Sequence, residues 1–387
     1  MRILLAESTS YFGLGGAAKV GRELIQGLAQ LGHSCAVVSL EDRNEMAVKG
    51  FRPGNAPGVA ELEVDGLKVF ASEKDQWRPM SECLRTFKPD WTLISEGGVL
   101  LLTIALEEYD PSRIVLIAQS TITNLPTESS GAIEDNIRSL LRKTRGIVTV
   151  SNYMRDYIKE WSGLDSTVLY PAAYGSGPFT HFHNFDSGYV SMINPCSYKG
   201  IAIFLALARS LPRVKFAAIT SWGTTAEDRA ALLQLPNVTL LKPERNLDDI
   251  FKQIKVLLVP SLWGEALGLV VGDAMLRGIP VLASNAGGLP EAKLGVDYVL
   301  PVNMIERYEF DSKGQVRPVI PKQDVSMWMK ALNDVITDRA LYERLSLASR
   351  EAALSFVGNL GPHHFERYLE GLAAAEQRSE AASFAAK

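Results

Sequence analysis

The stretch SLWGEALGLVVGDAMLRGIPVLASNAGGLPEA, residues 261–292, decides how the whole chain is interpreted. A short apolar run just before it predicts a buried strand, and its own pattern predicts a helix that begins near Leu267. Glu265 therefore lies in the loop at the positive end of this helix, and Asp273 lies inside the helix. Carboxylates accept hydrogen bonds from hydroxyl groups, and the free backbone amides of 266–269 donate them. The stretch therefore predicts a site for a polyhydroxylated ligand.

The same rhythm of strands and helices extends in both directions from this stretch. Short apolar runs bounded by polar turns predict buried strands, and segments with a helical apolar period predict helices. Their alternation favours parallel, doubly wound sheets, so we expect an α/β fold of two Rossmann-like domains that face a central cleft, with C-terminal helices closing the chain. Besides the helix described above, the expected strands are 2–7, 33–40, 90–95, 113–120, 146–151, 166–171, 189–194, 215–220, 238–241, 256–260 and 280–284, and the expected helices are 17–31, 131–143, 152–161, 200–211, 226–235, 247–254, 325–336, 340–355 and 361–376.

Segment 170–188 interrupts this rhythm, because it contains several prolines and glycines and has no helical period. It predicts the connection between the two domains. The expected boundaries are 1–178 for the first domain, 179–356 for the second, and 357–387 for a C-terminal helix that packs back toward the first domain. The Ala-rich tail after Gln377 is expected to fray.

Length and composition exclude several classes of protein. The chain has 387 residues, 47% of them hydrophobic and 22% charged, which is typical of a globular protein with two domains. Its formal net charge of -4 argues against a nucleic-acid partner and leaves only peripheral contact with a membrane open. The N-terminus is too quickly polar for a signal peptide, and no apolar run is long enough to span a bilayer. Cys35, Cys83 and Cys196 match no metal spacing, so we expect a cytoplasmic protein that binds no metal.

A second candidate site is the glycine-rich loop GLGGAA, residues 13–18, between the first strand and the first helix. It matches the pattern G-x-G-x-x-A of dinucleotide sites, but a polar spacer separates it from the strand, and Glu41 comes too late for the ribose-binding acid. A turn that requires positive φ explains one glycine but not three. Bare amides at a helix N-terminus therefore favour phosphate binding near Gly15 and Gly16.

Lys199 and Gly200 mark a similar point in the second domain, where a strand ends and a helix begins. A lysine at a helix N-terminus is unfavourable for the helix dipole unless an anion also binds there, and a solvated lysine is the alternative. Trp222 and Trp263 flank this predicted site. Their default role is core packing, and stacking on a base or a sugar is the alternative.

With these motifs the chain resembles the family 4 glycosyltransferases of GT-B fold. The resemblance rests on GLGGAAKVGRELIQGLAQLGH at 13–33, VSNYMRDYIKEWSG at 150–163, KG at 199–200, and PSLWGEALGLVVGDAMLRGIPVLASNAGGLPE at 260–291, which has the spacing of the family's E-x7-E motif. It implies transfer of a sugar from a nucleotide-diphosphate donor, a UDP- or GDP-sugar, with retention at the anomeric carbon. It also implies no essential metal, no other cofactor, and a small-molecule, metabolite or glycan acceptor.

The resemblance implies a role for each motif residue. Glu265 would contact the donor sugar and stabilise positive charge at its anomeric carbon, Asp273 would bind the nucleotide ribose, and Lys199 would pair with the diphosphate. Glu265 and Lys199 are thus the expected catalytic residues. The expected donor-binding residues are Gly15, Gly16, Asn194, Lys199, Arg245, Glu265, Ala266, Leu267, Gly268, Leu269 and Asp273, and the expected acceptor-binding residues are Glu96, Gln119 and Ser120.

Three positions depart from the family pattern. Asn194 stands where the family has an arginine for the pyrophosphate, Gln119 where it has a histidine on the acceptor side, and Asp273 where it has a longer glutamate. Arg245 could replace the missing arginine, and a solvated arginine is the alternative. The departures leave a second function open, a nucleotide-sugar-binding protein or partner subunit that has lost turnover. A third, based on the glycine-rich loop alone, is a nicotinamide-dependent oxidoreductase.

Overall fold

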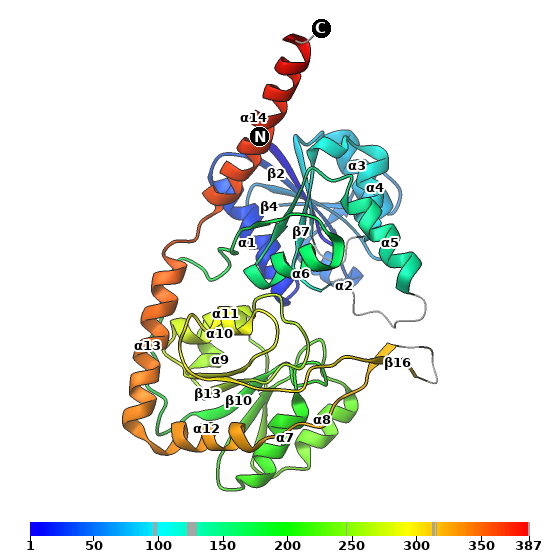
Figure 1. The fold of residues 1–387 in the computed structure, drawn as a ribbon. Coiled ribbons are helices and arrows are strands. Elements are labelled where there is room, and N and C mark those ends of the chain that lie inside the picture. Colours follow the sequence, from blue (N-terminus) through cyan, green and yellow to red (C-terminus); the bar gives the residue numbers. More distant parts are fainter. Residues whose placement is uncertain (96–98, 122–129, 245, 312–313, 315, 386–387) are drawn as a thin grey trace. The chain divides into compact units, whose positions relative to one another are not determined.

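A computed structural model describes residues 1–95, 99–121, 130–244, 246–311, 314 and 316–385. The chain divides into two compact units. Unit 1 contains Met1–Gln119, Gly131–Gly175 and Leu360–Lys387, and unit 2 contains Ser120–Ser130 and Ser176–Asn359. Each unit is built on its own sheet (Figure 1).

Unit 1 contains a nine-stranded sheet. Its strands are β1 (Arg2–Ala6), β2 (Ser34–Leu40), β3 (Arg52–Pro53), β4 (Ala60–Val64), β5 (Leu67–Ser72), β6 (Trp91–Ser95), β7 (Ile114–Ala118), β8 (Gly146–Thr149) and β9 (Thr167–Val168). The spatial order is β3-β4-β5-β2-β1-β6-β7-β8-β9. The run from β5 to β9 is parallel, and its order reverses between β1 and β6, as in a doubly wound fold. The buried apolar runs expected from the sequence form this central part.

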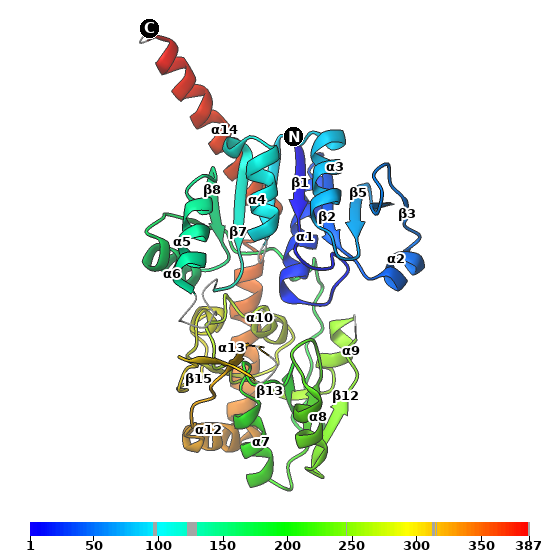
Figure 2. The same ribbon diagram turned by 90° about the vertical axis from the view of Figure 1, so that its right-hand side faces the viewer.

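The edge of this sheet that ends in β3 is built from residues 43–89, for which the sequence predicted no helix or strand. β4 pairs antiparallel with β5, and β3 pairs antiparallel with β4. Helix α3 (Trp77–Phe87) packs on β2 and β5 (Figure 2). The other helices of this unit are α1 (Gly16–Gln30), α2 (Arg43–Lys49), α4 (Val99–Glu108), η1 (Pro111–Arg113), α5 (Ser130–Leu141), α6 (Asn152–Ser162) and α14 (Pro362–Ala385).

The C-terminal helix α14 belongs to unit 1, although it is the last element of the chain. It packs on α1, and a Cβ atom at Gly27 would lie 2.8 Å from Pro362. His33 Nε2 lies 2.9 Å from Glu366 Oε1, and Arg145 donates a hydrogen bond of 3.0 Å to the carbonyl oxygen of Leu372. The helix continues to Ala385, and the fraying expected after Gln377 stays a prediction. Its alanine-rich sequence has high helix propensity.

Unit 2 contains a six-stranded sheet whose paired strands all run parallel. Its strands are β10 (Tyr189–Ile193), β11 (Phe216–Ile219), β12 (Val238–Leu241), β13 (Ile254–Val259), β14 (Val281–Ser284) and β15 (Val299–Leu300). The spatial order is β12-β11-β10-β13-β14-β15, which is the Rossmann order with its reversal between β10 and β13. A separate hairpin pairs β16 (Tyr308–Phe310) with β17 (Val316–Pro318).

Helices cover this sheet and close its core. They are α7 (Ile201–Ser210), α8 (Ala226–Leu233), α9 (Leu247–Phe251), α10 (Leu269–Leu276), α11 (Leu289–Ala292), α12 (Ser326–Thr337) and α13 (Arg339–Val357). α12 packs against α13, and α13 packs against α10 (Figure 1). The core includes Phe204, Phe216 and Trp328, all fully buried. Across the described residues, no helix is both long and apolar enough to cross a membrane.

Candidate functional site

Two loops of the candidate site follow β10 and β13, at the point where the strand order of unit 2 reverses. Because both strands are parallel, their carboxyl ends meet at one edge of the sheet, and ligands of open α/β sheets bind there. Residues 194–200 connect β10 to α7, and residues 260–268 connect β13 to α10. A backbone hydrogen bond of 2.8 Å from Leu262 to Tyr198 ties the loops together.

Lys199 and Glu265 meet in this pair of loops. Lys199 Nζ lies 2.5 Å from Glu265 Oε1. The same oxygen accepts hydrogen bonds from Ser261 Oγ at 2.5 Å and from Trp263 Nε1 at 2.9 Å. Glu265 is 9% exposed, so its charge is compensated by bonded groups rather than by bulk water. The structure thus brings together the two residues that the sequence analysis assigned to catalysis.

The environment of Glu265 keeps its carboxylate ionised. Burial acts to raise the pKa of Glu265, but the Lys199 ammonium and the hydrogen bonds from Lys199, Ser261 and Trp263 outweigh burial, and the net pKa is below its ordinary value. Ser261 and Trp263 were not assigned to the site from the sequence as partners of this carboxylate. Their position within four residues before Glu265, at the carboxyl end of a strand, was the available signal.

Glycines fix the backbone of the loop that carries Glu265. A Cβ atom at Gly287, where φ is +59°, would lie 2.4 Å from the backbone nitrogen of Glu265. A Cβ at Gly288 would lie 2.6 Å from the carbonyl oxygen of Ala266, and the Gly288 amide donates to the carbonyl oxygen of Glu265 at 2.7 Å. The GGLPE motif therefore allows the loop after β14 to press directly on the loop before α10.

The helix that follows Glu265 begins at Leu269, with Gly268 as its N-cap at φ +91°. The start expected near 267–268 is thus confirmed to within two residues. Asp273 lies in α10 and is 6% exposed, and its carbonyl oxygen accepts a hydrogen bond of 2.9 Å from Arg277. Asp273 does not lie on a solvated face of the helix, since α10 packs on α11 and α13.

Asn194, at the family's arginine position, supports a neighbouring loop. Its backbone has φ +57°, and its Oδ1 accepts a hydrogen bond of 2.9 Å from the amide of Gly223. The bond holds the turn after β11, next to Trp222. Trp222 is 67% exposed, so core packing, its default role, is wrong for this residue. Asn194 is neutral and adds no cation to the loop that carries Lys199.

The glycine-rich loop of unit 1 follows β1, also at a point of strand reversal. α1 begins at Gly16 with Gly15 as N-cap, one residue earlier than expected, and both glycines are at least partly exposed. Arg22 Nη1 donates to the carbonyl oxygens of Tyr11 at 2.8 Å and Gly13 at 3.2 Å. These bonds hold the loop against α1 and leave the first amides of the helix without an intrahelical partner.

The expectation that Glu41 comes too late for the ribose-binding acid is wrong, because Glu41 follows β2 directly, where dinucleotide-binding folds carry that acid. Here Glu41 is buried and accepts hydrogen bonds from the Tyr11 amide at 2.8 Å, Ser10 Oγ at 2.6 Å and Ser39 Oγ at 2.7 Å. Burial raises its pKa, although these hydrogen bonds act in the opposite direction. The carboxylate therefore fixes the loop after β1, which argues against a dinucleotide site at this position.

The remaining predicted residues are only partly described. Gln119 donates a hydrogen bond of 3.0 Å to Ser95 Oγ, so these two residues at the ends of β7 and β6 are neighbours. Ser120 follows Gln119 and is partly exposed. Glu96, predicted to bind the acceptor, and Arg245, predicted to bind the donor, lie outside the described residues.

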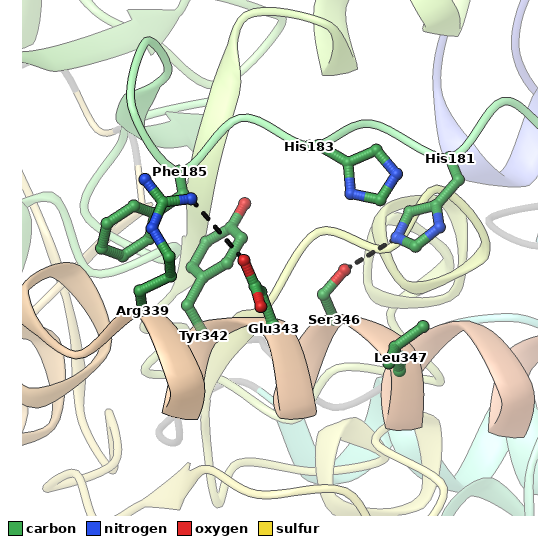
Figure 3. A pocket seen from close by; sticks show the side chains of 8 residues that line it. All are labelled: His181, His183, Phe185, Arg339, Tyr342, Glu343, Ser346 and Leu347. Atoms are coloured by element: carbon green, nitrogen blue, oxygen red, sulfur yellow. Dashed lines mark hydrogen bonds and ion pairs between the residues drawn. The ribbon is translucent and has the colours of Figure 1, made fainter.

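Unit 2 also contains a cavity of about 260 Å³ that includes none of the predicted site residues (Figure 3). It lies between the segment before β10 and helix α13. His181 Nε2 lies 2.9 Å from Ser346 Oγ, and Arg339 pairs with Glu343 at 3.6 Å. Its lining residues are His181, His183, Phe185, Arg339, Tyr342, Glu343, Ser346 and Leu347. Within the part of the chain that the structure describes, no three His, Cys, Asp or Glu side chains are grouped to hold a metal.

Comparison with known sequences finds similarity within unit 2. Residues 185–308 match the family model described as glycosyl transferases group 1. D-inositol 3-phosphate glycosyltransferase of Corynebacterium diphtheriae is 27% identical over 115 residues, 30% of this chain. The enzyme of the same name from Streptomyces avermitilis is 29% identical over 130 residues, 33% of this chain. The matched regions span 22% and 24% of the lengths of these two relatives.

Comparison with solved structures covers the whole fold. Sucrose-phosphate synthase from Thermosynechococcus elongatus has a TM-score of 0.69 and 16% sequence identity, with 100% of both chains covered. Anabaena HepE, solved with UDP and glucose, has a TM-score of 0.68 and 14% identity, with 97% of this chain and 100% of that chain covered. The chain therefore has the GT-B fold of these glycosyltransferases, and its second unit carries a domain similar to the glycosyl transferases of group 1.

Proposed function

We propose that the protein is a family 4 glycosyltransferase that moves a sugar from a nucleotide-diphosphate donor to a small-molecule, metabolite or glycan acceptor and retains the anomeric configuration. The observation that carries the proposal is the contact between Lys199 and Glu265 at the strand reversal of unit 2. One cation and one buried carboxylate in adjacent loops match the two charges of the reaction, a departing diphosphate and a positive sugar carbon.

Charge stabilisation explains how this site would act on a donor. Lys199 would neutralise the diphosphate as the bond between the anomeric carbon and the phosphate oxygen breaks. Glu265 would face the sugar, where positive charge develops. In front-face attack, the acceptor oxygen forms its bond on the side that the diphosphate leaves, and the acceptor proton goes to the departing phosphate oxygen. This reaction requires no protein nucleophile, and the proposal assigns no step to a metal.

The remaining donor contacts would come from backbone amides and from α10. The amides of 266–269 lie at the start of this helix, so they would hold diphosphate oxygens, and Asp273 would accept from the ribose. Gly15 and Gly16 would offer backbone amides to a phosphate, and Gln119 and Ser120 would contribute to acceptor binding. Two proteins of similar fold support this class of ligand, since HepE has been solved with UDP-glucose and a variant of TarM from S. aureus with UDP and α-GlcNAc-glycerol.

A thermal-shift panel with UDP, GDP, TDP, ADP, NAD and NADP tests the donor class. A ligand at 100 times its dissociation constant stabilises a protein by about 2.7 kcal/mol, which is measurable. We expect a nucleoside diphosphate to raise the melting temperature of the wild type and to lose this effect in Lys199→Ala. A shift by NAD or NADP alone would support the oxidoreductase and reject the transferase.

A second candidate function is a nucleotide-sugar-binding protein or partner subunit without turnover. Asn194 favours it, because a neutral amide bonded to Gly223 replaces the cation that would stabilise the leaving group. Release of the nucleoside diphosphate from the corresponding nucleotide sugar, measured with and without EDTA and across candidate acceptors, separates the two. Turnover that survives EDTA supports the metal-independent transferase, and binding without release supports the second function.

We also propose that the protein works in the cytoplasm. Cys35, Cys83 and Cys196 are all buried free thiols, as a reducing compartment permits. Reporter fusion and cell fractionation test this location, and recovery with an exported fraction would reject it.

A further inference from the structure

The indole of Trp263 contacts both members of the Lys199–Glu265 pair. Its Nε1 donates a hydrogen bond of 2.9 Å to Glu265 Oε1, and the Lys199 ammonium lies 4.9 Å from the centre of its ring. The ring also packs against Tyr198, with 5.3 Å between the ring centroids. Because neighbouring side chains hold this ring, its N–H is a fixed donor to the carboxylate.

Ser261 supplies a second fixed donor to the same carboxylate. It is fully buried, and its Oγ lies 2.5 Å from Glu265 Oε1. Its carbonyl oxygen accepts a hydrogen bond of 2.7 Å from Ser284 Oγ, at the end of the adjacent strand β14. Ser261 is therefore tied to the sheet on one side and to the carboxylate on the other.

Lys199 is the third donor to Glu265, and it differs from the other two. Its charge sits at the end of a flexible stem, and its side chain is 21% exposed. A diphosphate carries more negative charge than a single carboxylate and can compete for this ammonium. When Lys199 turns toward a diphosphate, Glu265 becomes a buried carboxylate whose described donors are Ser261 and Trp263. Hydrogen bonds from neutral donors still favour the ionised form.

We propose that Trp263 and Ser261 are positioning residues that keep Glu265 ionised and oriented after a donor diphosphate draws Lys199 away. Every hydrogen bond to this carboxylate from the described residues ends on Oε1, so Oε2 is the oxygen presented to the sugar. The inference rests on the proposed function. It also explains the ion pair: Glu265 holds Lys199 in place until the diphosphate arrives.

Substitution of Trp263 tests the inference, because it should change kcat and its pH profile but leave the Kd of the nucleoside diphosphate nearly unchanged. Trp263→Phe keeps a ring beside Tyr198 and removes the N–H. We expect kcat for nucleotide-sugar cleavage to fall about 10- to 100-fold at neutral pH, as for loss of a hydrogen bond to a charged group. The acid limb of the kcat profile should move to higher pH. The Kd of the nucleoside diphosphate should change less than about 3-fold, because the diphosphate is bound by Lys199.

Two further variants separate positioning from packing. Trp263→His can donate from its ring N–H, so it should recover part of the lost kcat, and Ser261→Ala should shift the pH profile in the same direction as Trp263→Phe. Trp328→Phe is the matched control, because this buried indole donates at 3.2 Å to the carbonyl oxygen of Pro301. It should lower the melting temperature and leave the pH profile of kcat unchanged.

The outcomes distinguish this inference from the proposed function. An unchanged pH profile in Trp263→Phe, or an equal loss of kcat and diphosphate affinity, would overturn the positioning role while the wild type remains a transferase. A wild type that binds no nucleoside diphosphate and cleaves no nucleotide sugar overturns the proposed function, and the inference with it. That failure is visible before any substitution is made.

Discussion

Lys199 Nζ lies 2.5 Å from Glu265 Oε1, although 65 residues separate them along the chain. The contact follows from parallel pairing of β10 and β13, which brings the loops after both strands to one edge of the sheet. Removal of either member of this short, shielded salt bridge is costly, because the other charge is then left buried and unpaired. The pair therefore couples the two charges that the proposed reaction requires.

Replacement of Lys199 by Ala should weaken diphosphate binding. The ammonium is the described cation at the loop after β10, and a hydrogen bond to a charged group contributes about 1.5–3 kcal/mol, so we expect the Kd of the nucleoside diphosphate to rise about 10- to 100-fold. Isothermal titration measures this change. Lys252→Ala is the matched control, because this lysine forms an exposed pair with Asp249 at 2.7 Å in the same unit. Equal affinities in both variants and the wild type would remove Lys199 from the site.

Replacement of Glu265 by Gln should reduce turnover far more than binding. Gln has nearly the same shape and still accepts from Ser261 and Trp263, but it lacks the charge that would stabilise a positive anomeric carbon. We expect kcat to fall about 100-fold or more, while the Kd of the nucleoside diphosphate stays within a few-fold. Steady-state kinetics and titration measure the two quantities. Wild-type turnover in this variant would contradict the assigned role of Glu265.

Replacement of Gly287 by Ala should destabilise unit 2 through the loop that carries Glu265. A Cβ atom there would meet the Glu265 backbone at 2.4 Å, and the φ of +59° disfavours a side chain, so the free energy of unfolding should fall by about 3 kcal/mol. Gly295→Ala is the control, since its φ is +80° but nothing lies within 4 Å of its Cβ position. It should cost about 1 kcal/mol. Equal losses in urea unfolding would show that backbone angle alone, and not close packing, requires Gly287.

The parallel strands, and the positions of Lys199 and Glu265 in loops after two of them, could be predicted from the sequence. Buried parallel strands are continuous apolar runs, and strand order then determines which loops share an edge. The hydrogen bonds of Ser261 and Trp263 could not be predicted, because the Trp263 ring packs on Tyr198 and the Ser261 backbone is bonded to Ser284, and both partners are distant in the chain. Residues 43–89 were missed although AELEV at 60–64 alternates apolar and charged residues and Asp65 and Gly66 follow it, which is the pattern of a β-hairpin.

A buried lysine gives unit 2 a pH-dependent stability. Lys293 is fully buried, and its Nζ donates to the carbonyl oxygens of Val281 at 2.6 Å and Asp297 at 2.9 Å. Burial lowers the pKa of Lys293 from 10.5 to about 7, although Asp297 acts in the opposite direction. Between these two pH values the unfolded chain holds a proton that the folded chain has lost. The free energy of unfolding should therefore rise with pH in this window, by up to about 1.4 kcal/mol per pH unit from this group.

Lys293→Met isolates this contribution, because Met fills a similar volume and has no charge to titrate. The substitution leaves two carbonyl oxygens without their donor, so it should lower stability by an amount that does not depend on pH. Urea unfolding of both proteins at pH 7.5 and pH 9.5 measures the difference. We expect the wild type to gain about 2 kcal/mol relative to Lys293→Met between these pH values. Parallel pH dependence in the two proteins would show that Lys293 keeps its proton in the fold, with its ammonium stabilised by the two carbonyl oxygens.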